Sequence, residues 1–306
     1  MASDEQLLEE LRPRGFAIAY RMLGSVSEAE DVVQEGLLRL HQALERGDDI
    51  SSPGAYLATV VTRLAIDELR SARVRRETYV GEWIPEPLLT DDRDDPARQA
   101  ETADSLSMAF LVLLESLSPE QRAVFLLREV FDYPYDRIAE MVGRSEDATR
   151  QIAVRARRHV DAGKPRFEAD KERRDELADR FFDAVMDGEL GGLEALLTED
   201  VELHGDGGGK APALARAVHG RDRVARTLVA WRKAGALFGG ARFERTEVNG
   251  QAGAVARSGD GRVFAVITLD VADERIQGIR SVVNPDKLRH VGPVVNLGEL
   301  LRARRG

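Results

Sequence analysis

Long basic and amide side chains are concentrated in one segment of this chain, and their types suit contact with nucleic acid. Residues 144–166 hold seven Arg or Lys against three Asp or Glu, a local balance of +4. Arg and Gln are hydrogen-bond donors that reach base edges and phosphates. The candidate contacts are Thr149, Arg150, Gln151, Val154, Arg155, Arg157 and Arg158. We expect Arg157 and Arg158 on phosphates and the residues before them at base edges.

The apolar residues of this segment predict how it is held. Ile138, Ala139, Val142, Ile152 and Ala156 can share one apolar seam of two helices that meet at Gly143. The basic side chains then point outward. This arrangement is typical of a helix-turn-helix, whose second helix enters the DNA major groove. The pattern favours a DNA-binding protein over a catalyst.

A second basic cluster lies earlier in the chain. Residues 63–76 carry five basic against two acidic residues, and the basic ones are Arg63, Arg70, Arg73, Arg75 and Arg76. The alternative for both clusters is an ordinary solvated helix face. The net charge of −10 does not oppose DNA binding, because charges beyond a Debye length of about 8 Å are largely screened.

Composition excludes several classes of protein. The chain has 306 residues, enough for two or three domains, and it has no Cys, which excludes disulfides and thiolate sites. The five His residues show no metal-ligand spacing. We therefore expect no metal and no cofactor. Without an apolar run or a basic, signal-like N-terminus, we expect no membrane association and a cytoplasmic location.

Periodicity and breakers divide the chain into helical and mixed parts. Residues 4–76 predict three helices, with Ser27 as the N-cap of the second and Gly47 after its end. Residues 104–162 are again helical. The segment from 172 to about 290 begins as a helix, and residues 201–204 then alternate like a strand. Residues 242–248, 252–258, 262–270 and 276–283 alternate too, and the Asn-Gly and Asp-Gly turns between them predict an antiparallel sheet in an α+β module.

A linker separates the helical blocks. Its Trp83-Ile84-Pro85-Glu86-Pro87 stretch cannot be helical, and we expect Trp83 to dock on another part of the protein. The fold class predicted is two all-α domains, the second a helix-turn-helix, followed by an α+β domain. The expected divisions are 1–78, 79–103, 104–167, 168–291 and a tail, 292–306, whose terminal arginines could be loose or touch nucleic acid.

Several motifs resemble one bacterial family. Tyr20 to Ser25 with Ala29 to Glu35, and Leu117 to Arg122 leading into the helix-turn-helix, resemble the two domains of an extracytoplasmic-function (ECF) sigma factor. The Trp83–Pro87 stretch, Asp206 to Lys210, and Asn284 to Leu288 resemble the group with a fused SnoaL-like (NTF2-like) domain, group 41 or sigma-J-like. The resemblance covers nearly the whole chain. One small departure is Ile84, where Leu is usual.

The resemblance implies partners for each surface. It implies promoter DNA and core RNA polymerase, through the β′ coiled coil and the β flap. The polymerase-binding candidates are Glu30, Asp31, Gln34 and Glu35, an acidic face suited to a basic partner. The third helix would read and open the −10 element. Tyr56 and the loop 47–53 would capture an unstacked base, and the basic cluster at 63–76 would bind the adjacent phosphates. The helix from Ala148 would read the −35 element. Alternatively, the acidic residues could simply cap an exposed helix, and Tyr56 could be an ordinary core residue.

The resemblance also implies a regulator in cis, without a separate anti-sigma factor. The contacts would join the linker residues Trp83, Pro85, Glu86 and Pro87 to two loops. The loop residues are Asp206, Gly207, Gly208, Gly209 and Lys210, with Asn284, Pro285, Asp286, Lys287 and Leu288. The alternative is that these are turns of the module's own fold.

Two other functions stay open from the sequence. One is a helix-turn-helix regulator whose C-terminal domain binds a small ligand. The other is an enzyme, with His204 and Asp206 near a strand end as an acid/base pair. No second carboxylate or nucleophile has a spacing that demands catalysis, so we expect no enzymatic activity.

Overall fold

The computed structural model describes residues 2–90, 106–163, 171–235, 240–272, 274–295 and 297–298. For residues 2–4, 73–77, 163 and 234–235 it describes only the backbone. Contacts group the chain into two compact units. We call Met1–Thr78 with Phe110–Lys164 the helical unit, and Tyr79–Ala109 with Pro165–Gly306 the sheet unit.

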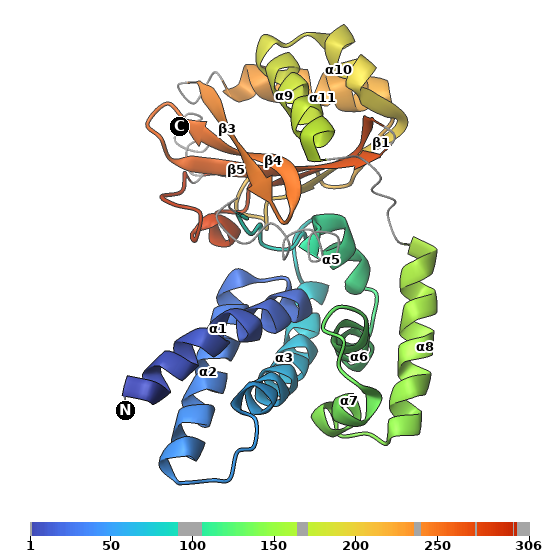
Figure 1. Ribbon diagram of the computed structural model, residues 1–306. Coiled ribbons are helices and arrows are strands. Elements are labelled where there is room, and N and C mark those ends of the chain that lie inside the picture. The colour runs from blue at the N-terminus through green and yellow to red at the C-terminus, as the bar shows by residue number, and fades with distance from the viewer. Residues whose placement is uncertain are drawn as a thin grey trace. The chain divides into compact units, whose positions relative to one another are not determined.

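The helical unit confirms the helices expected from the sequence (Figure 1). They are α1 (Ala2–Leu23), α2 (Val26–Glu45), α3 (Pro53–Glu77), most of α5 (Met108–Leu114), α6 (Pro119–Glu129), α7 (Tyr135–Val142) and α8 (Glu146–Gly163). The expected cap of α2 was wrong by two residues: Ser25, and not Ser27, accepts the Glu28 amide at 3.2 Å. Ser25 has the extended backbone that an N-cap needs, and the helix begins one residue later.

The sheet unit places helices over one face of a six-stranded sheet (Figure 1). Its elements are α9 (Lys171–Asp187), α10 (Leu190–Leu196), β1 (Leu197–Asp206), β2 (Val218–His219), α11 (Arg221–Gly235), β3 (Ala241–Val248), β4 (Gln251–Ser258), β5 (Val263–Ala272), β6 (Arg275–Val282) and the 3-10 turn η2 (Pro285–Leu288). The strand order is β2-β1-β6-β5-β4-β3. The antiparallel pairing expected for the four later segments is confirmed for β3 to β6. The first strand, β1, for which the sequence predicted no neighbour, runs parallel to β6. Alternation predicts a strand but not its neighbour.

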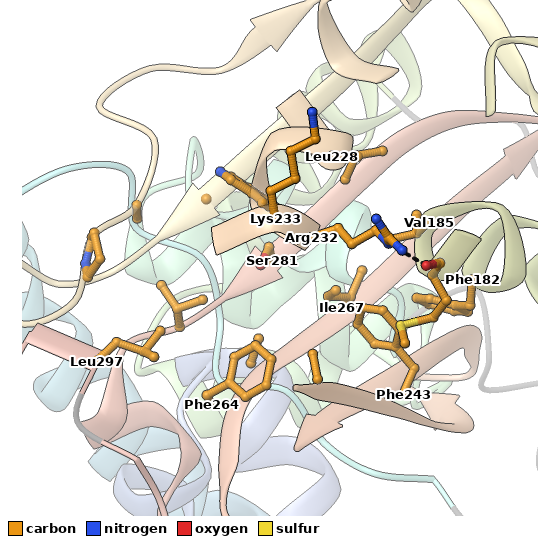
Figure 2. Close-up of a pocket in the computed structure, with 18 of the residues that line it drawn as sticks. Phe182, Val185, Leu228, Arg232, Lys233, Phe243, Phe264, Ile267, Ser281 and Leu297 are labelled. Carbon is orange, nitrogen blue, oxygen red and sulfur yellow. Dashed lines mark hydrogen bonds between the residues drawn. The ribbon is translucent and has the colours of Figure 1, made fainter. Parts of the chain in front are cut away.

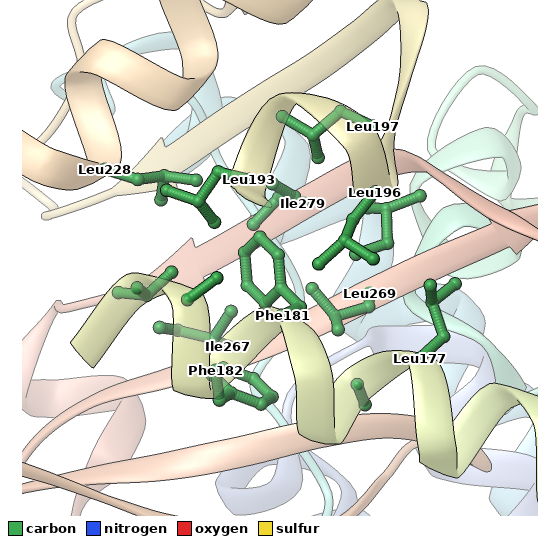
Figure 3. Packing of buried hydrophobic residues seen from close by; sticks show 14 of the residues in the cluster. Leu177, Phe181, Phe182, Leu193, Leu196, Leu197, Leu228, Ile267, Leu269 and Ile279 are labelled. Carbon is green, nitrogen blue, oxygen red and sulfur yellow. The ribbon is translucent and has the colours of Figure 1, made fainter. Parts of the chain in front are cut away.

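Alternating side chains give the sheet two apolar faces. On the helix side, Phe181 of α9 packs beside Leu269 and Ile279, and Phe182 lies beside Ile267 (Figure 3). Burying each such side chain stabilises the fold by about 1.5–3 kcal/mol. A pocket of about 670 Å³ opens beside this core (Figure 2).

The opposite face carries a smaller cluster that includes the linker. Ile84 and Met108 from the linker segment join residues of the strands and η2, namely Val248, Val255, Val263, Val266, Val282 and Leu288. The sheet is thus covered on one side by its own helices and on the other by the segment that joins the two helical blocks. In the described part of the tail, Val295 hydrogen-bonds to the Val263 carbonyl at 2.8 Å, and the terminal arginines lie outside the described residues.

Candidate functional site

The helix-turn-helix has the geometry expected from the sequence. Gly143 ends α7 in the left-handed conformation at φ 70°, which glycine adopts at low cost. Ile138, Ile152 and Ala156 are buried in the seam. Six of the predicted DNA contacts are exposed on α8, namely Arg150, Gln151, Val154, Arg155, Arg157 and Arg158. This face can therefore meet a groove without rearrangement of α8.

Thr149 departs from the expected set. It is fully buried, and its hydroxyl donates to the Ser145 carbonyl at 3.0 Å. The reason is helical spacing, since Thr149 lies one turn before Ala153 on the packed side of α8. The structure therefore contradicts its expected DNA contact.

Two predicted phosphate-binding arginines of α3 are engaged inside the helical unit. Arg63 donates to the carbonyls of Met141 at 3.0 Å and Glu140 at 2.8 Å, at the C-terminal end of α7. A cation is favourable there because the last helical carbonyls are unsatisfied. Arg70 lies 3.3 Å from Glu120, which also binds Arg144 at 2.8 Å. The side chains of Arg73, Arg75 and Arg76 lie outside the described residues, and Tyr56 is half-buried in the first turn of α3.

The polymerase candidates share an exposed side of α2. Glu30, Asp31 and Gln34 are exposed, and Glu35 is partly covered by its ion pair with Arg39. Leu38 continues this face one turn later with 48% of its surface exposed. The sequence analysis missed Leu38, although its i+4 spacing from Gln34 was a usable signal. An acidic face with one exposed apolar side chain suits a protein partner.

A buried arginine that sequence reasoning missed joins the two helical blocks. Arg122 is 1% exposed, its Nε donates to the Arg21 carbonyl at 3.1 Å, and it pairs with Glu115. Burial lowers the pKa of Arg122 to about 9. The capping box of Ser118 and Gln121 starts α6 just before it. The motif that begins at Leu117 therefore has a structural role in starting α6 and holding it to α1.

Asp206 organises the contact between the linker and the sheet. It is fully buried at the end of β1. Its Oδ1 accepts from the Tyr79 hydroxyl at 2.5 Å and the Gly208 amide at 3.0 Å, and its Oδ2 accepts from the Ile84 amide at 2.9 Å. Burial and the bond to Asp206 raise the pKa of Tyr79, which keeps that hydroxyl a donor. We call this arrangement, with Lys287, the linker clamp.

Lys287 completes the linker clamp from η2. Its Nζ lies 2.7 Å from Asp206 and 2.5 Å from the Ile84 carbonyl. The same amine lies 4.2 Å from the centre of the Trp83 ring. The expected anchor Trp83 is only partly buried, whereas Ile84 is 1% exposed. Ile84 is thus the deeper apolar anchor, and Trp83 covers the cation.

The glycine loop is shaped by its neighbours. Gly208 has φ +56°, and a Cβ there would lie 2.2 Å from the Asn284 amide nitrogen and 2.9 Å from the Tyr79 hydroxyl. Asn284 itself donates to Tyr79 at 2.8 Å. Lys210 pairs with Asp286 across the same junction. The linker stretch and both loops therefore meet at one place. In the linker stretch, Pro85, Glu86 and Pro87 are buried, and Pro285 starts η2.

His204 serves the linker rather than an acid/base pair with Asp206. Its Nδ1 lies 2.6 Å from Glu82 of the linker and its Nε2 lies 3.0 Å from Glu202. The hydrogen bond to Glu82 raises the pKa of His204. Because side chains alternate along β1, His204 and Asp206 point away from Gly205, which lines the pocket on the other face. The structure contradicts the suggested catalytic pair.

No group of three or more His, Asp or Glu with metal-binding geometry occurs among the described residues. Within the same part of the chain, no helix has the length and apolar character needed to cross a membrane.

Comparisons with known proteins agree with this geometry. Family models match Sigma-70 region 2 at residues 7–75, Sigma-70 region 4 at 107–160 and a SnoaL-like domain at 178–280. The chain is 39% identical to the ECF RNA polymerase sigma factor SigJ of Mycobacterium tuberculosis, over 91% of each protein. It is 33% identical to the probable sigma factor SigI of that species, over 60% of this chain and 63% of the relative. The crystal structure of SigJ matches with a TM-score of 0.74 and 35% identity, over 95% of this chain and 99% of that one. The chain therefore belongs to the ECF RNA polymerase sigma factors and directs polymerase to promoters.

Proposed function

We propose that the SnoaL-like module controls this sigma factor in cis by holding the linker between the two sigma regions. The observation that carries the proposal is Asp206, a buried carboxylate that binds the linker through Tyr79 and the Ile84 amide. A linker that is held has fewer conformations than a free one. The linker clamp would therefore limit how the two sigma regions spread on polymerase and promoter.

The DNA contacts belong to the same proposal. Arg150, Gln151, Val154 and Arg155 would meet −35 base edges, while Arg157 and Arg158 would bind phosphates. Arg63 and Arg70 would bind phosphates beside the −10 element once their bonds to α7 and to Glu120 are exchanged for DNA. Their present partners are carbonyl and carboxylate oxygens, and phosphate oxygens could replace these as hydrogen-bond acceptors.

The proposed polymerase contact is the exposed side of α2. Its acidic residues and Leu38 would bind the β′ coiled coil, and the second helical block would bind the β flap. The proposal needs no separate anti-sigma factor and no chemistry by the module, and it places the protein in the cytoplasm, where transcription occurs. A matched set of proteins in one transcription assay tests it.

The decisive experiment is transcription with purified core polymerase. The intact chain would be compared with a truncation after residue 168, with Asp206→Asn, and with the control Asp260→Asn on an exposed hairpin. We expect the truncation and Asp206→Asn to shift promoter-dependent output in the same direction, by about 5–150-fold for a coupling of 1–3 kcal/mol. Output equal to that of the intact protein in both would refute control in cis.

A further inference from the structure

The pocket of the sheet unit is lined almost entirely by apolar side chains. It measures about 670 Å³ and lies between α9, α11 and the sheet. Its apolar lining includes Phe182, Trp231, Phe243, Phe264, Ile267 and Leu297. Pockets of roughly 300–1,000 Å³ with such linings hold small organic ligands in other proteins. The size and lining suit a molecule with an apolar body.

Two cations are the charged groups among the described lining residues. Figure 2 shows Arg232 and Lys233 on α11, with the rings of Phe243 and Phe264 on the strand side. Arg232 donates through Nε to the Met186 carbonyl, its only hydrogen bond within the described part of the chain. In the same part, Lys233 makes no ion pair. Apolar walls with cations and without an acid select for a ligand that carries negative charge.

The opposite faces of β1 and β6 separate this pocket from the linker clamp. Gly205 and Ser281 line the pocket, whereas Asp206 and Val282 contact the linker or its apolar cluster. The pocket therefore does not serve linker docking. Its lining residues have no part in the DNA, polymerase or linker contacts described above, so the pocket calls for a separate function.

We propose that this pocket binds an amphipathic monoanion, a molecule with an aliphatic or aromatic body and one carboxylate. The body would fill the space between Phe182, Phe243 and Ile267. The carboxylate would lie at Lys233 and the two Nη atoms of Arg232. This binding is independent of control in cis, since it depends only on the pocket.

Decanoate, decanol and decylamine test the charge requirement, because they share one chain and differ in head group. We expect calorimetry on the full chain to give decanoate about 10- to 150-fold tighter binding than decanol, the value of one charge-assisted hydrogen bond. Decylamine should bind most weakly. Naphthylacetate distinguishes an aromatic from an aliphatic body. Equal binding of all three decyl compounds, or no binding of any acid, would overturn the proposal.

Variants locate the site. The double variant Arg232→Gln, Lys233→Gln should erase the preference for decanoate over decanol, whereas Arg226→Gln, an exposed cation of the same helix outside the pocket lining, should keep it. Ala265→Phe should fill the cavity and abolish binding of every probe. Because the chain has two tryptophans, Trp83→Phe leaves Trp231 in the lining as the sole indole reporter. Decanoate binding that survives both the charge and the filling variants, with Trp231 fluorescence unchanged, would show that the site is elsewhere.

Discussion

Asp206 and Lys287 form a buried ion pair, and both members also bind the linker. Their charged atoms lie 2.7 Å apart, and each hydrogen-bonds to a main-chain group of Ile84. A buried pair is costly to form, yet removing one partner is costlier because the other charge stays unpaired in a region of low dielectric constant. The pair therefore ties the fold of the module to the position of the linker.

Replacing Asp206 should both destabilise the sheet unit and free the linker. Asp206→Asn leaves the Lys287 charge without its partner, so we expect a loss of about 3–5 kcal/mol in unfolding free energy. Hydrogen exchange at residues 79–90 should rise strongly. Asp260→Asn removes an exposed charge on a hairpin. This control should leave the unfolding free energy and the hydrogen exchange of residues 79–90 as in the parent. Unchanged protection of the linker in Asp206→Asn would contradict the role assigned to this carboxylate.

The glycine loop offers a second way to loosen the linker clamp. Gly208→Ala combines an unfavourable left-handed backbone, about 1–3 kcal/mol for a non-glycine residue, with a clash against Asn284 and Tyr79. Gly261→Ala is the matched control, since its φ of +83° is also left-handed but a Cβ there meets open space.

Both variants should lower Tm, and Gly208→Ala should lower it further. Only Gly208→Ala should increase proteolysis of the linker. Equal effects of the two substitutions on linker cleavage would show that the loop has no part in linker docking.

Glu120 holds two arginines, and one of them, Arg70, is a proposed phosphate contact. It binds Arg70 and Arg144, and all three side chains are at least partly exposed. Exposed pairs contribute about 0.2–1 kcal/mol each, so Glu120→Gln should strengthen promoter binding by about two- to fivefold. Fluorescence anisotropy with a promoter fragment selected by the holoenzyme measures this. Asp260→Asn makes the same charge change in the sheet unit and should have no effect; a promoter affinity of Glu120→Gln equal to that of the parent speaks against competition.

Arg155 tests the reading of the −35 element. Arg155→Ala should weaken promoter binding by about 1–3 kcal/mol and relax sequence preference at one base pair. Arg180→Ala, on α9, removes the same charge outside the helix-turn-helix and should change neither. Sequence selection with the holoenzyme provides the comparison. An unaltered preference at every position would exclude Arg155 from the base edges.

His204 predicts a pH dependence of linker docking. The charged groups around it are Glu82, Glu202 and Arg280, and the balance raises the pKa of His204 above its ordinary value near 6.5. A group whose folded pKa is raised binds more protons when folded. Its contribution is therefore complete below about pH 6.5 and is lost as the pH rises through the folded pKa.

Linker protection should accordingly fall between neutral and alkaline pH in the parent. His204→Gln should flatten that part of the profile. The control His219→Gln changes an exposed ring that pairs with Glu202 and should leave the profile intact. A parent profile that is flat across this range would remove His204 from the linker contacts.

Local patterns in the sequence determined the helices, most strand positions and the helix-turn-helix. The seam of Ile138, Ile152 and Ala156 follows from the 3.6-residue period, and Gly143 ends a helix because only glycine adopts its backbone cheaply. The Asn249-Gly250 turn between β3 and β4 is equally local. These features depend on residues a few positions apart, so one sequence contains all the information they need.

Only the tertiary structure decided which distant groups meet. Periodicity could not show that β1 runs parallel to β6, or that Arg63 would bind the carbonyls at the end of α7. It identified the linker stretch and both loops, but it favoured Trp83 over Ile84 as anchor and suggested His204 with Asp206 as an acid/base pair. The physical reason is that burial and pairing depend on how faces pack across long separations in the chain, which the local period of a helix or strand does not record.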